Sequence, residues 1–136
     1  MAGYYHLSVG IISRGKGRSA VACSAYRAGA VLEDLRYGSV HDYRPRKGII
    51  ATGLLAPEEA PSWAKDRGSL WNELEAFERR KDAQLAREFV LGLPCQLSHE
   101  EHKEAVEQFI QQELLPRGLV ADYAIHAPNR KGDERN

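Results

Sequence analysis

Alternating hydrophobic and polar positions predict β-strands near both ends of the chain and in its second half. Residues 4–12 alternate over most of their length, and residues 119–126 form a similar run close to the C-terminus. Within residues 85–93, Phe89 and Glu88 are predicted to lie on opposite faces, because successive side chains of a strand point in opposite directions. The apolar face predicted for this strand consists of Phe89, Leu91 and Leu93.

Three segments carry the signals of helices. The first begins after Ser19, a residue type favoured at the N-cap, and runs through small residues to about Gly29. The second covers residues 69–81, and its apolar side is formed by Leu70, Trp71, Leu74 and Phe77. The third opens at residues 98–101, which match a capping box, and its predicted inward positions are Ala105, Val106, Phe109, Ile110 and Leu114. Because small residues allow a helix to lie close to a sheet, we expect the first helix to pack tightly on a strand.

The segment between the first two helices predicts a β-hairpin. Residues 35–43 and 49–55 are both strand-like, and the break Arg44-Pro-Arg-Lys-Gly48 separates them. The predicted element order is therefore β-α-β-β-α-β-α-β, which is typical of an α+β domain with helices packed on an antiparallel sheet. The predicted arm carries both cations and aromatic rings, namely Arg36, Tyr37, Tyr43, Arg44, Arg46 and Lys47. This composition suits contacts with phosphates and bases, and it equally suits an exposed hairpin with ordinary surface charges.

The composition is that of one soluble domain with an uneven distribution of charge. The 136 residues fit a single core, and no apolar run approaches the roughly 18 residues that would span a membrane. We also recognise no signal peptide, and two cysteines, Cys23 and Cys95, predict reduced, buried thiols in a cytoplasmic protein. Residues 1–52 contain eight Lys/Arg and three Asp/Glu, which gives this part a charge of +5 and leaves −5 for the rest of a chain whose net charge is zero. A basic half of this kind fits a polyanion surface or simply a solvated one.

Tyr26 is the residue that most clearly indicates chemistry. It lies in the alanine-rich helix directly after the first strand, where its phenol would lie beside whatever the sheet carries. A tyrosine here is either a structural residue half-buried against the sheet or a nucleophile that forms a long-lived covalent phosphodiester. The phenol is weakly nucleophilic, since its ordinary pKa is about 10, and it would need a divalent cation or a base to assist it.

His126 and Glu88 are the candidate partners of Tyr26. On its strand His126 shares a face with Asp122, and Glu88 would be a buried carboxylate if the Tyr26 helix covers its face. Such a carboxylate could accept the phenolic proton or orient a metal-bound imidazole. One histidine cannot build a metal site alone. Among the remaining histidines, His99 and His102 are expected to be solvated, His41 lies in the predicted arm, and His6 could face the site from the first strand.

Basic residues around the first helix predict an anion site. Arg14, Lys16 and Arg18 flank glycines just before the helix N-terminus, whose free amides attract anions. The sequence lacks the GxxxxGK[ST] pattern of nucleotide-binding loops, which disfavours a nucleoside triphosphate. The residues predicted to contact nucleic acid are Arg14, Lys16, Arg18, Arg27, Arg44, Arg46 and Lys47.

Several short motifs in a specific order resemble one protein family over nearly the whole chain. They are Ala2-Gly-Tyr-Tyr-His-Leu7, Gly17-Arg-Ser-Ala20, Ser24-Ala-Tyr-Arg-Ala-Gly29, Leu70-Trp-Asn72, Arg80-Lys-Asp-Ala-Gln-Leu-Ala-Arg-Glu88, Gly92-Leu-Pro94 and Asp122-Tyr-Ala-Ile-His126. Together they resemble the N-terminal relaxase domain of the MobA/MobL (MobQ-type) plasmid mobilisation proteins, which include the TraA-like conjugative relaxases.

The resemblance implies an endonuclease of the HUH type that acts in the bacterial cytoplasm. Its implied substrate is single-stranded plasmid transfer-origin DNA, and its nick is specific for one site and one strand. It implies that Tyr26 attacks the scissile phosphate and stays linked to the 5′ end. It also implies that His126 is the first metal-binding histidine, for Mn or Mg, and that Glu88 is the active-site glutamate. Other relaxosome proteins and a coupling protein are the implied protein partners, without insertion into a membrane.

One departure from the family pattern concerns the metal. The resemblance implies two further histidines in a Pro-His-x-His segment, and the sequence stops at Asn136 where that segment should begin. We therefore expect a single relaxase-like domain, residues 1–136, truncated before the remaining ligands, with weak metal affinity and weak or no cleavage. Three possibilities stay open: a metal-dependent strand transferase, a non-catalytic module that binds origin DNA, and a structural scaffold.

Overall fold

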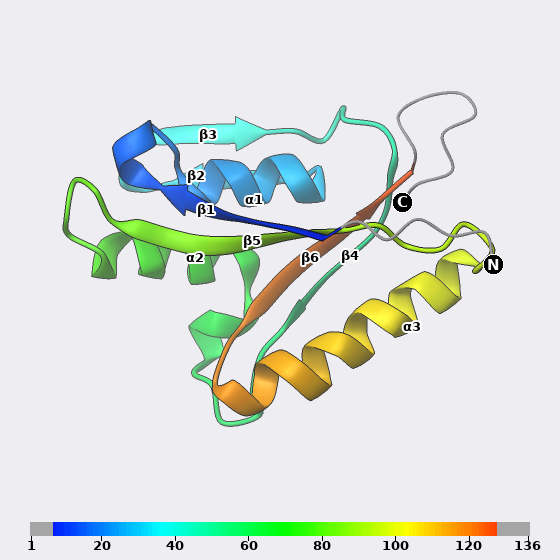
Figure 1. The fold of residues 1–136 in the computed structure, drawn as a ribbon. Helices are drawn as coiled ribbons and strands as arrows, with labels where there is room; N and C mark the ends of the chain where they lie inside the picture. The colour runs from blue at the N-terminus through cyan, green and yellow to red at the C-terminus, as the bar shows by residue number, and fades with distance from the viewer. Residues whose placement is uncertain (1–6, 128–136) are drawn as a thin grey trace.

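The computed structural model describes residues 7–127 and has the predicted α+β architecture, with antiparallel strands and helices packed against them (Figure 1). The described strands form three antiparallel pairs, β1 with β5, β2 with β3 and β4 with β6. The strands are β1 (Leu7–Ser13), β2 (Val31–Asp34), β3 (Ser39–Asp42), β4 (Ile49–Leu55), β5 (Gln84–Leu91) and β6 (Ala121–His126). The α-helices are α1 (Ala20–Ala28), α2 (Arg67–Phe77) and α3 (His99–Phe109), and short 3₁₀ turns follow β1, precede α2 and precede β6.

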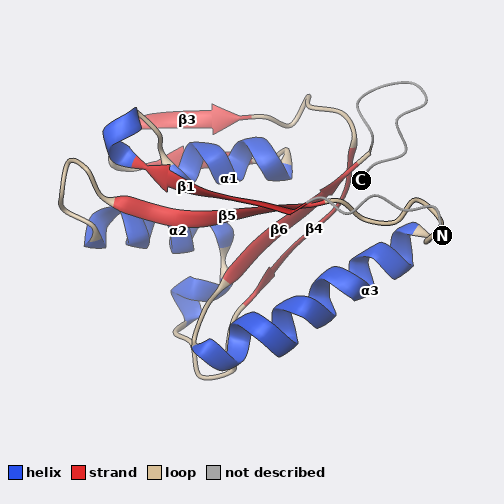
Figure 2. Ribbon diagram, in the orientation of Figure 1, coloured by secondary structure: helices blue, strands red, loops and turns tan. Residues whose placement is uncertain are grey.

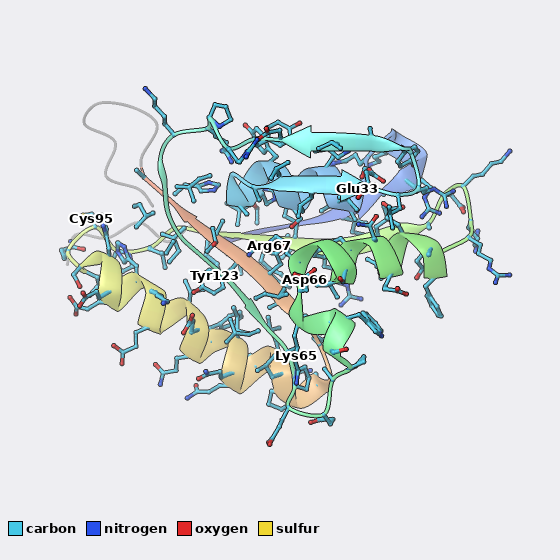
Figure 3. All side chains as sticks on the ribbon, turned by 180° about the vertical axis from the view of Figure 1, so that it is seen from behind. Glu33, Lys65, Asp66, Arg67, Cys95 and Tyr123 are labelled. Atoms are coloured by element: carbon cyan, nitrogen blue, oxygen red, sulfur yellow. The ribbon has the colours of Figure 1, made fainter. Side chains whose placement is uncertain are left out.

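The pair β1–β5 has one face covered by helices and one open face. Helices α1 and α2 lie on the same side of it, which is the rear in Figure 2 and the front in Figure 3. Ile12 and Leu85 are buried there against Ala20 of α1, so the small residues of α1 do allow close packing, as predicted. The predicted apolar face is wrong as a core face, because Phe89 and Leu91 remain 44% and 36% exposed beside the exposed side chains of β1.

The pair β4–β6 forms the second core together with α3. Tyr123 and Ile125 of β6 are buried against Ile110, at the end of α3. Gly53 lies opposite Tyr123 in the ladder, and a Cβ atom at Gly53 would lie 2.4 Å from the Tyr123 ring. The ring therefore folds back over β4 and donates a hydrogen bond from its hydroxyl to Glu107 (2.5 Å), and burial raises its pKa above the usual range. Tyr123 is labelled in Figure 3, between the two strands and α3.

The predicted hairpin between residues 35–43 and 49–55 is wrong. The hairpin is instead β2–β3, in which Asp34 pairs with Ser39 across a turn that ends at Gly38 with φ 64°. Strand β4 pairs with β6, seventy residues further along the chain. The physical reason is burial. Strand β4 is apolar and pairs with another mainly apolar strand, β6. Strand β3 carries alternating polar residues and stays at the surface.

Helix α2 is shifted from its predicted bounds, and three of its four predicted apolar positions face the core while the fourth does not. It begins after Asp66, whose carboxylate accepts the Ser69 amide N–H (2.9 Å), and it ends at Phe77. Phe77 was expected inside and is 80% exposed, whereas Glu75 is 1% exposed. Glu75 is buried because the guanidinium of Arg14 donates to its carboxylate at 2.7 Å. Helix α2 therefore contributes a buried ion pair to the interior in addition to its apolar contacts.

Helix α3 follows its predicted capping box, but two of its expected contacts are wrong. Ser98 accepts the Glu101 amide while Glu101 accepts the Ser98 amide. Ala105 and Phe109 are exposed, whereas Val106 and Ile110 contribute to the core, and the helix continues as a π-turn over Ile110–Leu114. His102, expected to be solvated, is fully buried and donates from Nε2 to the Pro94 carbonyl (2.6 Å).

Among residues 7–127, no helix combines the length and the apolar character needed to cross a bilayer. Cys23 and Cys95 are half-buried rather than buried as predicted, and no disulfide joins them. His6 lies outside the described residues.

Candidate active site at the C-terminal end of helix α1

The C-terminal turn of α1 is where the predicted site residues meet. The helix ends at Gly29, whose φ of 62° lies in the left-handed region that glycine adopts without strain. A Cβ atom there would lie 2.4 Å from the Ile49 side chain, so glycine also permits the close approach of α1 to β4. Tyr26 and Arg27 therefore stand in the last turn, directly beside the start of β4.

Tyr26 projects from this turn and is 47% exposed. The guanidinium of Arg46 lies over its ring, with 3.9 Å between Cζ and the ring centroid. Tyr43 meets the same ring edge-on, with 5.2 Å between centroids and 88° between planes. The phenol is thus held by two side chains of the segment between β3 and β4, and it remains open to solvent.

His126 reaches the same turn from the end of β6. Its Nε2 lies 2.8 Å from the carbonyl oxygen of Arg27. Since a carbonyl only accepts hydrogen bonds, Nε2 carries the proton, and in a neutral imidazole Nδ1 keeps a lone pair available for a ligand. His126, which the family resemblance predicts to be a metal ligand, therefore joins the end of β6 to the end of α1.

Two carbonyl groups at the end of α1 are capped by these side chains. The last carbonyls of a helix have no partner within it. Here Arg46 Nη1 donates to the Tyr26 carbonyl, and His126 Nε2 donates to the Arg27 carbonyl. Cationic and proton-donating groups suit this end, because it carries the negative pole of the helix dipole.

Glu88 faces α1 from β5, which meets the condition under which the sequence predicts a buried carboxylate. Its carboxylate forms an ion pair with Arg27 and lies 3.9 Å from the guanidinium of Arg18, and its side chain is 21% exposed. The Arg18 guanidinium also donates to the Cys23 sulfur at 3.2 Å. The Glu88 carboxylate is therefore partly buried, and it is paired with Arg27 in the last turn of α1.

Asp122 is a site residue whose role the sequence did not reveal. Its carboxylate accepts hydrogen bonds from Ser24 (2.6 Å), Trp71 Nε1 (2.8 Å) and Arg67 Nε (3.0 Å). Arg67, at the start of α2, is visible beside strand β6 in Figure 3. The signal that could have found this residue is the face that it shares with His126, because β6 directs that face toward α1. Asp122 ties α1, α2 and β6 together two pleats below His126.

The predicted cations do not all lie on one surface. Arg14 is 8% exposed and donates to the carbonyls of Glu78 and Arg80 as well as to Glu75, so its prediction as a nucleic-acid contact is wrong. The predicted anion site at the start of α1 is also wrong, because the Ala20 amide donates to Glu75 (2.9 Å) and the Ala22 amide donates to Ser19. The protein's own carboxylate occupies the place of an external anion. Lys16 and Lys47 are exposed, and Arg44 pairs with Asp42 at the surface.

The described residues do not by themselves fit a metal ion. Within residues 7–127 there is no group of three or more His, Cys, Asp or Glu side chains that could hold one. His126 offers Nδ1 as one donor, while Glu88 is paired with arginine. Glu88 and His126 both bind Arg27, and Arg46 lies over the adjacent Tyr26, so the last turn of α1 holds an exposed phenol beside a guanidinium group.

Comparison with known proteins gives a consistent family. The model of the MobA/MobL family matches residues 18–136. The mobilization protein MobL of Acidithiobacillus ferridurans is 40% identical over 129 residues, covering 95% of this chain and 33% of that protein. The conjugal transfer protein TraA of Rhizobium radiobacter is 39% identical over 131 residues, covering 89% of this chain and 12% of TraA.

The fold has a counterpart among solved structures. A structure described as the molecular basis of vancomycin resistance transfer in Staphylococcus aureus superimposes with a TM-score of 0.85 at 28% identity. The match covers 96% of this chain and 65% of that one. The chain thus spans a third or less of the curated relatives named above and about two thirds of the solved one. On the family match over most of its length, this chain belongs to the MobA/MobL family, with a relaxase-like α+β fold.

Proposed function

We propose that this domain nicks one strand of plasmid transfer-origin DNA through attack by Tyr26 on a phosphodiester. The oxygen of Tyr26 forms a bond to phosphorus, and the bond from phosphorus to the 3′ oxygen breaks. The phenolic proton is released and the departing 3′ oxygen takes up a proton, so one phosphodiester replaces another without water or an oxidant. The product is a 5′-phosphotyrosine with a free 3′ hydroxyl, which can later be rejoined by the reverse reaction.

The single observation that carries this proposal is the convergence of contacts on the last turn of α1, where Arg46 lies over the Tyr26 ring while Glu88 and His126 bind the neighbouring Arg27. An exposed phenol beside the Arg46 guanidinium suits attack on a phosphate, because the cation attracts the phosphate and offsets its negative charge. Glu88 holds Arg27, and through it the last turn of α1, against β5. We assign Glu88 this positioning role, and acceptance of the phenolic proton remains its alternative role.

The divalent ion belongs to the same proposal. His126 Nδ1 would supply one ligand to Mn²⁺ or Mg²⁺, and the ion would polarise the phosphate when bound. Because the described residues do not complete a metal site, further ligands must come from elsewhere, and the roles of Tyr26, Arg27 and Glu88 are derived without the ion. Binding of Mn²⁺ to the protein and to His126→Ala, measured by calorimetry, tests this assignment directly.

The test of nicking uses single-stranded oligonucleotides that tile the transfer-origin region of the plasmid carrying the gene. With Mn²⁺ or Mg²⁺ present, we expect a covalent protein–DNA adduct on a denaturing gel. Tyr26→Phe should abolish the adduct and leave binding largely intact. Tyr37→Phe is the matched control, because Tyr37 is also an exposed tyrosine (52%) and lies in the β2–β3 turn. An adduct that persists in Tyr26→Phe would contradict the proposal.

A second candidate is a module that binds origin DNA without cutting it. The observation that favours it is that residues 7–127 contain no group of three or more His, Cys, Asp or Glu side chains that could hold a metal ion. Wild-type protein that binds the oligonucleotide and forms no adduct would support this candidate. In both cases binding should weaken steeply with salt, since phosphate contacts release counterions. We place either activity in the bacterial cytoplasm, alongside relaxosome and coupling proteins.

A further inference from the structure

We propose that Arg46, with Tyr43, is a positioning residue for Tyr26. This inference rests on the proposed role of Tyr26 as nucleophile. The sequence alone assigned Arg46 to nucleic acid, as one of several cations in a basic segment. The structure gives it a more specific place, because its guanidinium contacts both the backbone and the ring of one residue.

The two contacts of Arg46 fix the direction of the Tyr26 side chain. Its Nη1 donates to the Tyr26 carbonyl, while Cζ lies 3.9 Å from the centre of the Tyr26 ring. A rigid planar group bound at both points restricts rotation of the side chain relative to the helix. Tyr43 closes a second side of the ring with its edge. The phenol therefore has one favoured orientation although nearly half of the residue is exposed.

The segment that carries these two residues is itself anchored to the site. The Tyr43 amide donates to the Ala30 carbonyl (2.9 Å), and the Arg46 amide donates to the Tyr43 carbonyl (3.0 Å). At its far end the Gly48 carbonyl accepts the Ala127 amide (2.7 Å), one residue beyond His126. The segment from Tyr43 to Gly48 is thus bound at one end to the residue after α1 and at the other end to the residue after β6. Arg46 lies between these two anchored ends.

The charge of Arg46 adds a chemical consequence to the geometry. A cation over an aromatic face is attracted by the π electrons. This attraction increases when the phenol gives up its proton, because the ring then carries more negative charge. Arg46 would therefore favour the form of Tyr26 that attacks phosphorus, and also the form that leaves when the strand is rejoined. Orienting the oxygen and stabilising its charge both act on the chemical step rather than on DNA affinity.

The experiment compares Arg46→Met with Arg46→Lys and with the control Arg44→Met. Arg44 lies in the same segment and is exposed, but it pairs with Asp42 and not with Tyr26. In single-turnover reactions Arg46→Met should slow adduct formation by about 100-fold, the order expected for a misplaced reacting group. Its oligonucleotide affinity should stay close to that of Arg44→Met. Arg46→Lys should recover part of the rate, since an ammonium group can still reach the carbonyl and the ring.

Equal losses of affinity and rate in Arg46→Met and Arg44→Met would overturn the inference, because Arg46 would then be an ordinary phosphate contact. A measurement without DNA separates this outcome from failure of the proposed function. With 3-fluorotyrosine incorporated and the Tyr26 signal assigned from Tyr26→Phe, Arg46→Met should shift the ¹⁹F resonance of Tyr26 and Arg44→Met should not. If Arg46→Met shifts the Tyr26 resonance but the wild-type protein forms no adduct with DNA, the nicking proposal is rejected and the contact between Arg46 and Tyr26 is supported. An unchanged resonance rejects the positioning role even where nicking occurs.

Discussion

The two ends of helix α1 are built in opposite ways. At the N-terminal end, free amides donate to Glu75 and Ser19, and the Ser19 hydroxyl donates to Asp34 (2.6 Å), with Asp34 and Glu75 almost completely buried. At the C-terminal end, free carbonyls accept from Arg46 and His126, which remain partly exposed. Both ends satisfy the helix dipole with the appropriate sign of charge.

The difference shows where stability and function are separated. The N-terminal groups are bound to other buried groups of the protein and are shielded from water, so their loss should unfold the domain. The C-terminal groups are held in place by one or two contacts each and keep a face open for a ligand. The same helix thus links a buried support to an exposed site only two turns away.

The largest expected effect is at the buried end. Glu75→Ala would leave the Arg14 guanidinium and the Ala20 amide without their carboxylate partner. Removing one partner of a buried ion pair costs about 3–5 kcal/mol, which should leave the domain marginally stable or unfolded. Urea denaturation followed by circular dichroism measures this. Asp82→Ala removes the exposed pair with Arg80 and serves as the control, with a change below about 1 kcal/mol.

A smaller loss is expected between the two ends, at Asp122. Asp122→Asn replaces one acceptor oxygen by a donor that faces the donors of Ser24, Trp71 and Arg67. An amide donor that faces other donors at this mostly buried position should lower the free energy of unfolding by about 2 kcal/mol. Because Asp122 ties β6 to α1, the rate of adduct formation should fall as well. Unchanged stability together with unchanged rate would contradict the role given to Asp122 here.

At the open end, stability should barely change while activity is lost. His126→Ala removes one exposed cap of α1, which should cost about 1 kcal/mol or less. Adduct formation should nevertheless fall below detection if His126 also serves the metal. Thermal unfolding and the gel assay, performed on the same preparation, give the two values. A large drop in melting temperature would show that the two ends do not differ as described.

The smallest effect concerns exposed helix caps and depends on pH. The Ser69 backbone hydrogen bond holds the pKa of Asp66 below its usual range, and the Ser98 backbone does the same for the pKa of Glu101. A carboxyl group with a lowered pKa in the folded state adds stability above its unfolded pKa, about 4, and loses it as the pH falls through the folded value. The urea midpoint should therefore decrease below about pH 4. Asp66→Asn keeps the cap without the titration, so its midpoint should depend less on pH.

The sequence by itself determined most of the helices and strands and which side chains share a face of each. Capping residues and glycines marked the start and end of α1, because these signals act within a few residues. Alternation placed Glu88 opposite Phe89, and it placed Asp122 and His126 on one face of their strand. Local periodicity is enough for such statements, since the geometry of one strand or helix fixes which side chains share a side.

Only the tertiary structure decided which faces are covered and which segments become partners. Periodicity cannot tell that the face of Phe89 is open, or that β4 pairs with β6 instead of closing a hairpin with β3. It also cannot show that Arg14 is buried by Glu75, or that Arg46 lies over Tyr26. Burial and ion pairing depend on residues that are distant along the chain, and their free energies depend on the water that those residues exclude.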